Sequence, residues 1–344
     1  MAGERAATLS DVAREAGVSL ATASRALNGS DRVVRPELQE RVLAAADKLG
    51  YTPNANAQAM ARGSTETVGL LVKDISDPYF STIAGGLADE AEKHGLLVML
   101  CNTGGQPERE QKFLAALRRQ RSRAIVLSGS DTAGVRHTSE VADLLTSYLE
   151  GGGRAAAISQ PRLPVDTVVI DNHGGAKALA ERLAGLGYRR AAVLTGPADL
   201  LVSAERHAGF AEGWLEATGS TPTYVSDEFS RDGGRRAMTR LLENGRNNGS
   251  EVDCVFAVND LMALGALAAC RQAGIEVGPE LAVAGFDDIA TLRDVTPGLT
   301  TVRLPLADIG RLALELVLGE PSAELRKRSV HGEVVLREST PPRS

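Results

Sequence analysis

The sequence predicts an all-α helix-turn-helix headpiece followed by an α/β core of two doubly wound lobes with parallel sheets. Two observations lead to this fold class. A helix–glycine–helix pattern occupies residues 8–28, and from residue 67 onward short apolar runs alternate with polar stretches of helical length. Such alternation is typical of parallel sheets with helices on both faces, and 344 residues suffice for two or three domains.

Residues 8–28, TLSDVAREAGVSLATASRALN, predict two short helices joined by a tight turn. Thr8 can cap the first helix, with Asp11 at its third position, and Ser19 can cap the second. Gly17 follows the first helix, where the chain needs a left-handed conformation. The inward positions are Leu9, Val12, Ala13 and Ala16 in the first helix and Ala23, Ala26 and Leu27 in the second. The pattern fits a helix-turn-helix that enters a DNA major groove, and also an ordinary helical hairpin.

A third helix is expected over residues 36–49, with Gly50 at its end, and it completes a small domain. Residues 53–64 form a linker in which Asn54 can cap a short alanine-rich helix. A helix of about nine residues is marginal alone because nucleation is costly. Composition therefore also fits a flexible tether.

The core runs are TVGLLV, LLVMLC, AIVLSG, AAAIS, DTVVID, RAAVLTG and LAVAGFDD. The alternation of apolar runs with polar helical stretches in residues 67–160 is repeated in residues 165–290, which indicates two lobes of the same kind. Ligands of such sheets bind beyond the carboxyl ends of the strands, so we expect a binding cleft between the lobes.

Charge and cysteine content restrict the function classes. Residues 1–62 contain eight Lys and Arg and seven Asp and Glu, a net charge of +1, so the total of −6 leaves −7 for the remainder. A weakly basic headpiece on an acidic body favours DNA contact at one end. The three cysteines show no metal or redox spacing, and we find no signal peptide or membrane span, so we expect a cytoplasmic protein without a membrane partner.

Motifs for catalysis are missing from the sequence. The five histidines are scattered without HxxxH or HExxH spacing, and we find no GxSxG, GxGxxG or GxxxxGK[ST]. We therefore expect no enzyme, no bound metal and no cofactor.

The headpiece sequence DVAREAGVSLATASRALN closely resembles that of the lac and gal repressor (LacI/GalR) family of bacterial transcription regulators. The resemblance continues, in the family's order, through GYTPNANAQAMARG, VGLLVKDISDPYF, VFAVNDLMALGAL, VAGFDD, LTTVRLPLADIGR and VVLREST. It covers nearly the whole chain. It implies lobes of the periplasmic-binding-protein type, with the chain crossing between them near residues 161, 290 and 320. The implied domains are a headpiece (1–52), a hinge (53–64) and a core (65–344), with lobes 65–160 plus 291–320 and 161–290 plus 321–338.

The resemblance also implies which headpiece residues contact DNA. Leu20, Ala21 and Arg25 would select the operator sequence, and Arg25 can pair with guanine through two hydrogen bonds. The expected phosphate and positioning contacts are Thr8, Ser19, Thr22, Ser24 and Asn28. The hinge would bind the minor groove through Asn54, Ala57 and Met60, with Met60 as an apolar wedge where the family usually has Leu.

Ligand-contacting positions of the core lie at strand ends. Two adjacent aromatic residues, Tyr79 and Phe80, follow the first strand in a chain with only 3% aromatic residues, and such faces suit stacking on a sugar or a base. Asp77 is a candidate from its place after the first strand. The resemblance implies ligand contact at Tyr79, Phe80, Asp131, Arg206, Phe229, Asn259, Asp287 and Arg303. Asp77 and Asp260 also fit a purely structural role as helix caps.

These observations together predict a homodimeric transcription regulator, most simply a repressor, that binds a palindromic operator and is controlled by a small molecule, with a sugar expected. Two other classes remain open. One is a sugar-binding transport protein with the same core, against which the headpiece argues. The other is an enzyme of the doubly wound class, against which the missing catalytic motifs argue.

Overall fold

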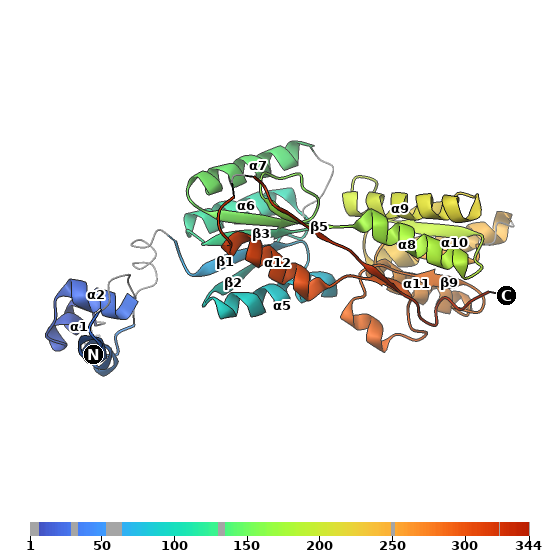
Figure 1. Ribbon diagram of the computed structural model, residues 1–344. Helices are drawn as coiled ribbons and strands as arrows, with labels where there is room; N and C mark the ends of the chain where they lie inside the picture. The colour runs from blue at the N-terminus through green and yellow to red at the C-terminus, as the bar shows by residue number, and fades with distance from the viewer. Residues whose placement is uncertain are drawn as a thin grey trace, which may run out of the picture. The chain divides into compact units, whose positions relative to one another are not determined.

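The computed structural model describes residues 7–28, 34–52, 64–129, 135–248, 252–322 and 324–343 (Figure 1). The chain divides into two compact units, Met1–Glu66 and Thr67–Ser344. The predictions for Asn54, Ala57, Met60 and Asp131 lie outside the described residues. Among the helices that are described, none is long and apolar enough to cross a membrane.

The headpiece contains the three predicted helices, α1 (Leu9–Glu15), α2 (Leu20–Asn28) and α3 (Pro36–Lys48). Its small core is built from alanines and two fully buried valines, Val12 and Val42. The capping box at Thr8 is confirmed, since the Asp11 N–H donates to Thr8 Oγ1 at 3.3 Å and the Thr8 N–H donates to Asp11 Oδ2 at 3.0 Å. Local signals in the sequence therefore set where the first helix begins.

The turn between α1 and α2 is confirmed as well. Gly17 has φ of 66°, in the left-handed region that favours glycine. Arg41 Nη2 of α3 donates to the Ala16 carbonyl oxygen at 2.5 Å, which satisfies a carbonyl left open at the helix end. Ser19 caps α2 by accepting from the Thr22 N–H at 3.1 Å. The turn thus fixes the direction in which α2 leaves the headpiece core.

The first lobe of the core contains a six-stranded parallel sheet of order β11-β5-β4-β3-β1-β2. Its strands are β1 (Thr67–Val72), β2 (Leu97–Asn102), β3 (Ala124–Ser128), β4 (Arg154–Ile158), β5 (Asp166–Ile170) and β11 (Lys327–Val330). Leu70 packs with residues of α5 (Pro78–Lys93) and α12 (Leu306–Leu318), whereas Leu71 packs with α6 (Pro107–Arg119) and α7 (Val135–Glu150). Alternate side chains thus bury both faces of the sheet, as predicted.

The second lobe contains a four-stranded parallel sheet of order β7-β6-β8-β9, flanked by helices and joined to an antiparallel pair, β10 with β12. Its elements are α8 (Asn172–Gly185), β6 (Ala191–Thr195), α9 (Leu201–Thr218), β7 (Thr223–Ser226), α10 (Arg231–Asn248), β8 (Cys254–Ala257), α11 (Asp260–Ala273), β9 (Ala282–Ala284), the 3-10 helix η1 (Ala290–Asp294), β10 (Thr301–Arg303) and β12 (Glu333–Val335). Phe210 stacks on Phe256 with ring centroids 4.8 Å apart, and both are fully buried with Trp214. The predicted class of two doubly wound lobes is confirmed.

The expected positions of the chain crossings are wrong. The run at 166–170, expected in the second lobe, is β5, which pairs with β4 and β11 and completes the first sheet. The chain crosses between β5 and α8, between β10 and α12, and between β11 and β12, rather than near 161, 290 and 320. An apolar run identifies a buried strand, but its pairing partners decide which sheet it joins.

Candidate functional site

The N-terminal part of α2 carries an exposed surface on the headpiece. Leu20 is 51% exposed and Ala21 is exposed beside it. Arg25 lies one turn later on the same helix, and its Nε donates to the Ala21 carbonyl oxygen at 3.1 Å. An aliphatic pair followed by a guanidinium is suited to a thymine methyl group and a guanine edge.

The other headpiece candidates differ in whether their side chains already form hydrogen bonds within the protein. Thr8 and Ser19 both cap helices, and Ser19 Oγ lies 2.8 Å from Thr22 Oγ1. Ser24 is half-buried, and the Asn28 side chain lies outside the described part of the chain. DNA contact by these residues stays a prediction.

A cavity of about 160 Å³ lies between the two lobes of the core. Its wall combines strand-end residues of both sheets with the beginnings of α5, α8 and α11. Seven of the nine predicted ligand contacts line it: Asp77, Tyr79, Phe80, Arg206, Phe229, Asn259 and Asp287. Tyr79 and Phe80 meet edge to face with ring centroids 4.9 Å apart. The cavity therefore offers both aromatic surface and polar groups.

Arg206 of α9 is held in the wall by contacts to several parts of the second lobe. Its Nη2 forms an ion pair with Asp287 Oδ1 at 2.8 Å, its Nε donates to Asn172 Oδ1 at 2.9 Å, and its Nη1 donates to the Val258 carbonyl oxygen at 2.8 Å. The guanidinium also lies 3.8 Å from the centroid of the Phe286 ring. Four contacts hold a planar group that is only 2% exposed, so its orientation toward the cavity is fixed.

Asp287 occupies a strained and desolvated position. Its φ is 119°, a backbone region that favours glycine, and hydrogen bonds to the backbone of β10 and Leu304 hold it there. Burial raises the pKa of Asp287 to about 7, although Arg206 acts to lower it. The neighbouring Asp260 is fully buried, and burial together with the charge of Asp287 raises its pKa well above the ordinary value. The site thus holds carboxyl groups whose charge depends on pH.

Helix capping explains two of the predicted contacts in part. Asp77 caps α5 by accepting from the Tyr79 N–H at 2.9 Å, and burial raises its pKa. Asn259, and not Asp260, caps α11 by accepting from the Met262 N–H at 2.9 Å. Asp260 instead accepts from the Ile289 N–H and from Thr301 Oγ1, at 2.9 and 2.7 Å. The predicted helix cap is confirmed for Asp77 and wrong for Asp260, whose buried bonds to Ile289 and Thr301 are nevertheless structural.

The structure does not bring Arg303 into the cavity. The side chain is 49% exposed and its Nε pairs with Asp288 at 2.7 Å. Val302, one position earlier on β10, is fully buried. Because successive side chains of a strand point to opposite sides, the buried valine turns Arg303 outward.

Lys73 is a cavity residue that the motif analysis missed. It follows β1, and its Nζ lies 5.5 Å from the centroid of the Phe229 ring, which belongs to the other lobe. Burial lowers the pKa of Lys73, while Asp77 and Asp74 act to raise it. In the described parts of the chain no carboxylate lies within ion-pair distance of this ammonium, which leaves it able to donate to a ligand.

Gln160 and Asn172 were missed in the same way. Each follows a strand of the first sheet and lines the cavity, and each donates to Glu205 Oε2 of α9, at 2.5 and 3.1 Å. The rule that polar residues at strand ends face the ligand would have selected both, since the sequence shows them directly after AAAIS and DTVVID. Their bonds connect the end of the first sheet to the helix that carries Arg206.

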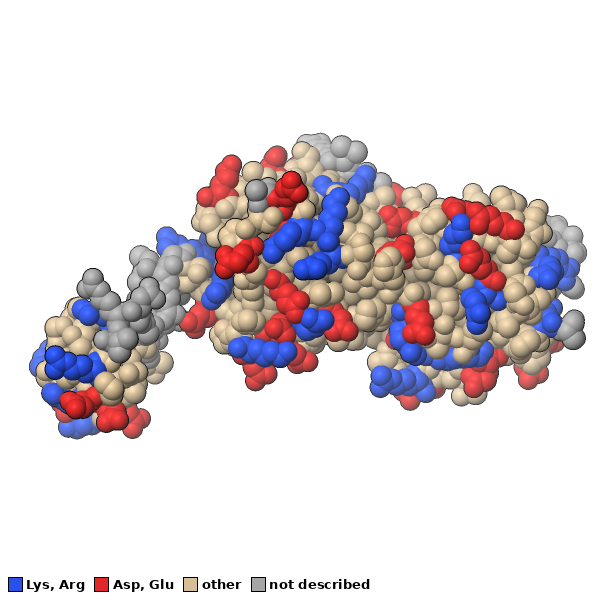
Figure 2. Space-filling model, in the orientation of Figure 1, with Lys and Arg blue, Asp and Glu red and all other residues tan. Residues whose placement is uncertain are grey.

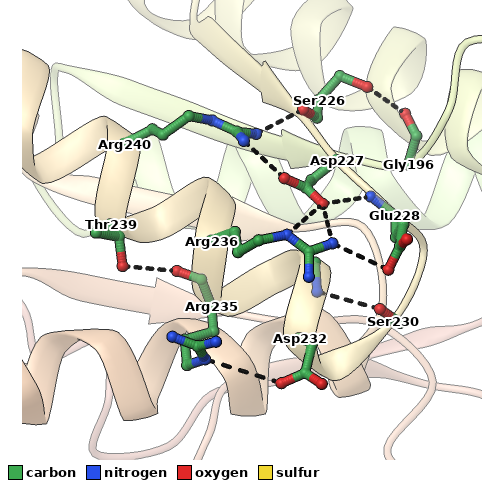
Figure 3. A network of polar contacts seen from close by, with 11 residues as sticks. Gly196, Ser226, Asp227, Glu228, Ser230, Asp232, Arg235, Arg236, Thr239 and Arg240 are labelled. Carbon is green, nitrogen blue, oxygen red and sulfur yellow. Dashed lines mark hydrogen bonds and ion pairs between the residues drawn. The ribbon is translucent and has the colours of Figure 1, made fainter.

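The loop that carries Phe229 is braced by α10 (Figure 3). Asp227 accepts from Arg236 Nε at 3.1 Å and pairs with Arg240 Nη1 at 2.7 Å. Arg240 also donates to the Ser226 carbonyl oxygen, and Ser226 Oγ donates to the Gly196 carbonyl oxygen, both at 2.8 Å. Two arginines of one helix therefore hold the backbone on one side of Phe229.

The described residues contain no candidate metal site. There, no group of three or more His, Cys, Asp and Glu side chains is arranged to hold a metal ion. The three cysteines are all free and buried.

Comparisons with known proteins agree with this arrangement. A family profile described as "Bacterial regulatory proteins, lacI family" matches residues 8–54, and one described as "Periplasmic binding protein-like domain" matches residues 180–340. The HTH-type transcriptional regulator GalS of Salmonella typhimurium is 34% identical over 94% of this chain and 93% of its own length. This relative is a transcriptional regulator.

Two solved structures show the same fold. The transcriptional regulator CelR in complex with cellobiose is 31% identical, with a TM-score of 0.66 over 97% of this chain and 99% of its own. A LacI family transcriptional regulator from Enterococcus faecium with bound ribose is 25% identical, with a TM-score of 0.69 over 81% of this chain and 100% of its own. With its headpiece, its two-lobed core and a relative of this identity along nearly its whole length, the chain belongs to the LacI family of bacterial regulatory proteins.

Proposed function

We propose that the chain is a homodimeric repressor acting in the cytoplasm, whose affinity for a palindromic operator is set by a sugar bound between the core lobes. The observation that carries the proposal is the interlobe cavity with Arg206, Asp287 and Asn259 beside the rings of Tyr79 and Phe229. Oriented donors and acceptors next to aromatic faces are what adjacent sugar hydroxyls require. The cellobiose and ribose bound to two relatives support this ligand class.

We propose a division of the chain into three domains. Residues 1–52 bind the major groove, residues 53–64 form the hinge, and the core binds the sugar and a second copy of the chain. Within the headpiece Leu20, Ala21 and Arg25 read bases, and Ser19 and Thr22 position the helix on phosphates. A two-fold protein on a palindromic site doubles these contacts, which compensates for a headpiece of only weak positive charge.

Strand β2 supports the proposed dimer. It is an edge strand of the first sheet, and Leu97, Met99 and Leu100 on it are 73%, 37% and 39% exposed. An exposed apolar edge strand is a liability unless another chain covers it. A second copy, placed there by the two-fold axis of the dimer, would cover it.

The proposed coupling uses the connections between the lobes. Gln160 and Asn172 both bond Glu205 beside Arg206, and Lys73 of the first lobe lies over Phe229 of the second. A ligand that engages Arg206 and Lys73 favours one arrangement of the two lobes over another. The lobe that is joined to the headpiece then shifts against its dimer mate, which changes operator affinity, and the operator in turn changes the affinity for the sugar.

The test is operator binding measured by fluorescence anisotropy with the full chain. The DNA is a palindromic site from the region upstream of the gene, and random duplex of equal length is the comparison. A panel of mono- and disaccharides is then titrated onto the complex. Tight, salt-sensitive binding to the palindrome that one sugar abolishes is the expected result, and equal weak binding to both duplexes would overturn the proposal and favour a sugar-binding protein without a DNA role.

A matched pair of double variants tests whether Leu20 and Ala21 recognise bases. Leu20→Ser with Ala21→Gln changes the proposed reading surface of α2. Leu43→Ser with Ala44→Gln changes the same dipeptide at exposed positions of α3. The first variant should alter the preferred sequence in a selection from randomised duplexes, and the second should leave it unchanged.

A further inference from the structure

A basic run stands out in the first lobe. Residues 118–123 read RRQRSR, and the sequence contains no Asp or Glu between Glu110 and Asp131. The chain beyond residue 62 nevertheless carries a net charge of −7. Four arginines within six residues are therefore a local exception on an acidic body. The function proposed above does not use them.

The fold places this run at the end of the lobe where β1 begins. Arg118 and Arg119 form the last turn of α6, and Arg123 directly precedes β3. The Arg123 N–H donates to the carbonyl oxygen of Thr67, the first residue of β1, at 2.9 Å. Figure 2 shows Lys and Arg side chains at this end of the lobe. The run therefore lies beside the point at which the chain enters the core.

The turn after α6 holds the arginines outward. The Ser122 N–H donates to the Leu117 carbonyl oxygen and the Arg121 N–H to that of Arg118, the two bonds of a Schellman motif. Arg121 takes the left-handed position of this motif with φ of 54°, where glycine is usual. All four arginines are exposed, and within the described chain no carboxylate lies at ion-pair distance from Arg118, Arg119 or Arg123. Three guanidinium groups are thus held at the surface without a counter-ion among the described residues.

Chain connectivity limits how far this surface can lie from DNA that the headpiece binds. The segment 53–66 joins the headpiece to β1, and at about 3.5 Å per residue it reaches at most ~50 Å. DNA carries one charge about every 1.7 Å of its axis and extends beyond the base pairs that a headpiece reads. This tether length allows the arginines to reach phosphates on either side of the operator.

We propose that Arg118, Arg119 and Arg123 contact phosphates of the DNA that flanks the operator. The contact is independent of base sequence, because guanidinium groups on phosphates position a protein without reading bases. It adds affinity through counter-ion release and leaves operator preference to α2. This inference rests on the proposed operator binding.

The test compares the salt dependence of DNA binding for two triple variants of the full chain. Arg118→Gln, Arg119→Gln and Arg123→Gln together remove the proposed contacts. Arg271→Gln, Arg293→Gln and Arg328→Gln remove the same charge from exposed arginines elsewhere in the core. Association constants are measured at several salt concentrations on a duplex that extends one helical turn beyond the operator on each side, and on one that ends at its edges.

The first triple variant should lose about 0.9 from the slope of log K against log salt for each lost phosphate contact. The proposed dimer carries the three arginines twice, so the loss of six contacts makes binding to the extended duplex roughly 2,000-fold less sensitive to a roughly fourfold change in salt. The control triple variant should keep the wild-type slope, and on the short duplex all three proteins should have equal slopes. Equal slopes of the two variants on the extended duplex would overturn the inference, whereas failure of the wild-type protein to prefer its operator would instead contradict the proposed function.

Discussion

Arg206 and Asp287 form a buried ion pair, 2.8 Å between Nη2 and Oδ1, that joins α9 to the segment after β9. The pair lies in the cavity wall, and the guanidinium uses its other nitrogens on Asn172 and Val258. A ligand hydroxyl that reaches Asp287 therefore meets a carboxyl group paired with a guanidinium that Asn172 and Val258 also hold. Binding at this point and the stability of the second lobe depend on the same contacts.

A double-variant cycle should reveal this dependence. Arg206→Met leaves Asp287 buried without its cation, and we expect a loss of about 3–5 kcal/mol in the free energy of unfolding. Asp287→Asn alone should also destabilise the protein. The double variant should lose less than the two single losses together, by about 1–3 kcal/mol, because the second change removes a group already left without its partner.

The measurement is urea unfolding followed by tryptophan fluorescence. Trp214 is the one tryptophan of the chain and is fully buried in α9, so it reports on the lobe that holds the pair. If the stability losses of the two single variants added up in the double variant, the coupling between Arg206 and Asp287 would be contradicted.

The raised pKa of Asp287 predicts a pH effect with a definite sign. Its ordinary value of 3.8 rises to about 7 in the folded protein because of burial. Between these values the folded state binds more protons than the unfolded state, so the free energy of unfolding falls as pH rises through this window. Relative to Asp287→Asn, the wild-type protein should lose about 2 kcal/mol more between about pH 5 and about pH 8.

Urea titrations of both proteins at the two pH values check this. The variant serves as the control for the titrating groups that do not interact with Asp287. Asp260 is excepted, because the charge of Asp287 contributes to its raised pKa. A wild-type protein that gains stability relative to the variant on going to the higher pH would show that the carboxyl is not desolvated as the structure indicates.

Neighbouring arginines of α10 should differ in their effect on the ligand. Arg236 holds Asp227 at the base of the Phe229 loop, whereas Arg235 meets only the exposed Asp232, at 3.8 Å, among the ion pairs of the described residues (Figure 3). Arg236→Ala should weaken binding of the sugar found in the screen by about 1 kcal/mol, since Arg240 remains as a partner of Asp227. Arg235→Ala should leave binding unchanged, because an exposed pair contributes little.

Isothermal titration calorimetry of the two variants with that sugar is the measurement. Equal affinities would mean that the bonds to Asp227 do not position Phe229. Circular dichroism of both variants checks that α10 is intact.

Headpiece structure could be predicted from the sequence because its signals are local. Thr8, Gly17 and Ser19 each act within a few residues, through a cap, a left-handed turn and a second cap. No partner distant in sequence is needed to interpret them. The helix boundaries therefore followed from the chain almost residue by residue.

The core was predictable only at the level of strand ends. That rule placed Asn259 and Asp287 on the cavity correctly, because parallel strands present their carboxyl ends at one edge. Arg206 lies in the second turn of α9, and the family resemblance placed it there. The strand-end rule failed for Arg303, where the side-chain direction on β10 mattered, and the crossing positions failed because β5 takes its place through pairing with β11 from the far end of the chain. Local sequence specifies neither side-chain direction at a strand end nor long-range pairing.

Adjacent glycines of α5 should respond to alanine with opposite signs. A Cβ on Gly86 would lie 2.0 Å from the Ala307 carbonyl oxygen of α12, and Gly310 of α12 approaches the Ile83 carbonyl oxygen in the same way, at 2.1 Å. A Cβ on Gly85 would meet no atom within 4 Å. The two helices thus touch through backbone at one glycine and not at its neighbour.

Gly86→Ala must push α12 away from α5, and we expect a loss of about 1–3 kcal/mol in the free energy of unfolding, as for other overpacked contacts. Gly85→Ala should gain about 0.5–1 kcal/mol, because alanine loses less backbone entropy than glycine in a helix. Scanning calorimetry of the full chain at one protein concentration measures both, and Gly310→Ala should reproduce the loss seen at Gly86. If both α5 variants shifted the unfolding temperature in the same direction, the close contact between α5 and α12 would not exist in solution. The packing of α12 against the first lobe would then need another explanation.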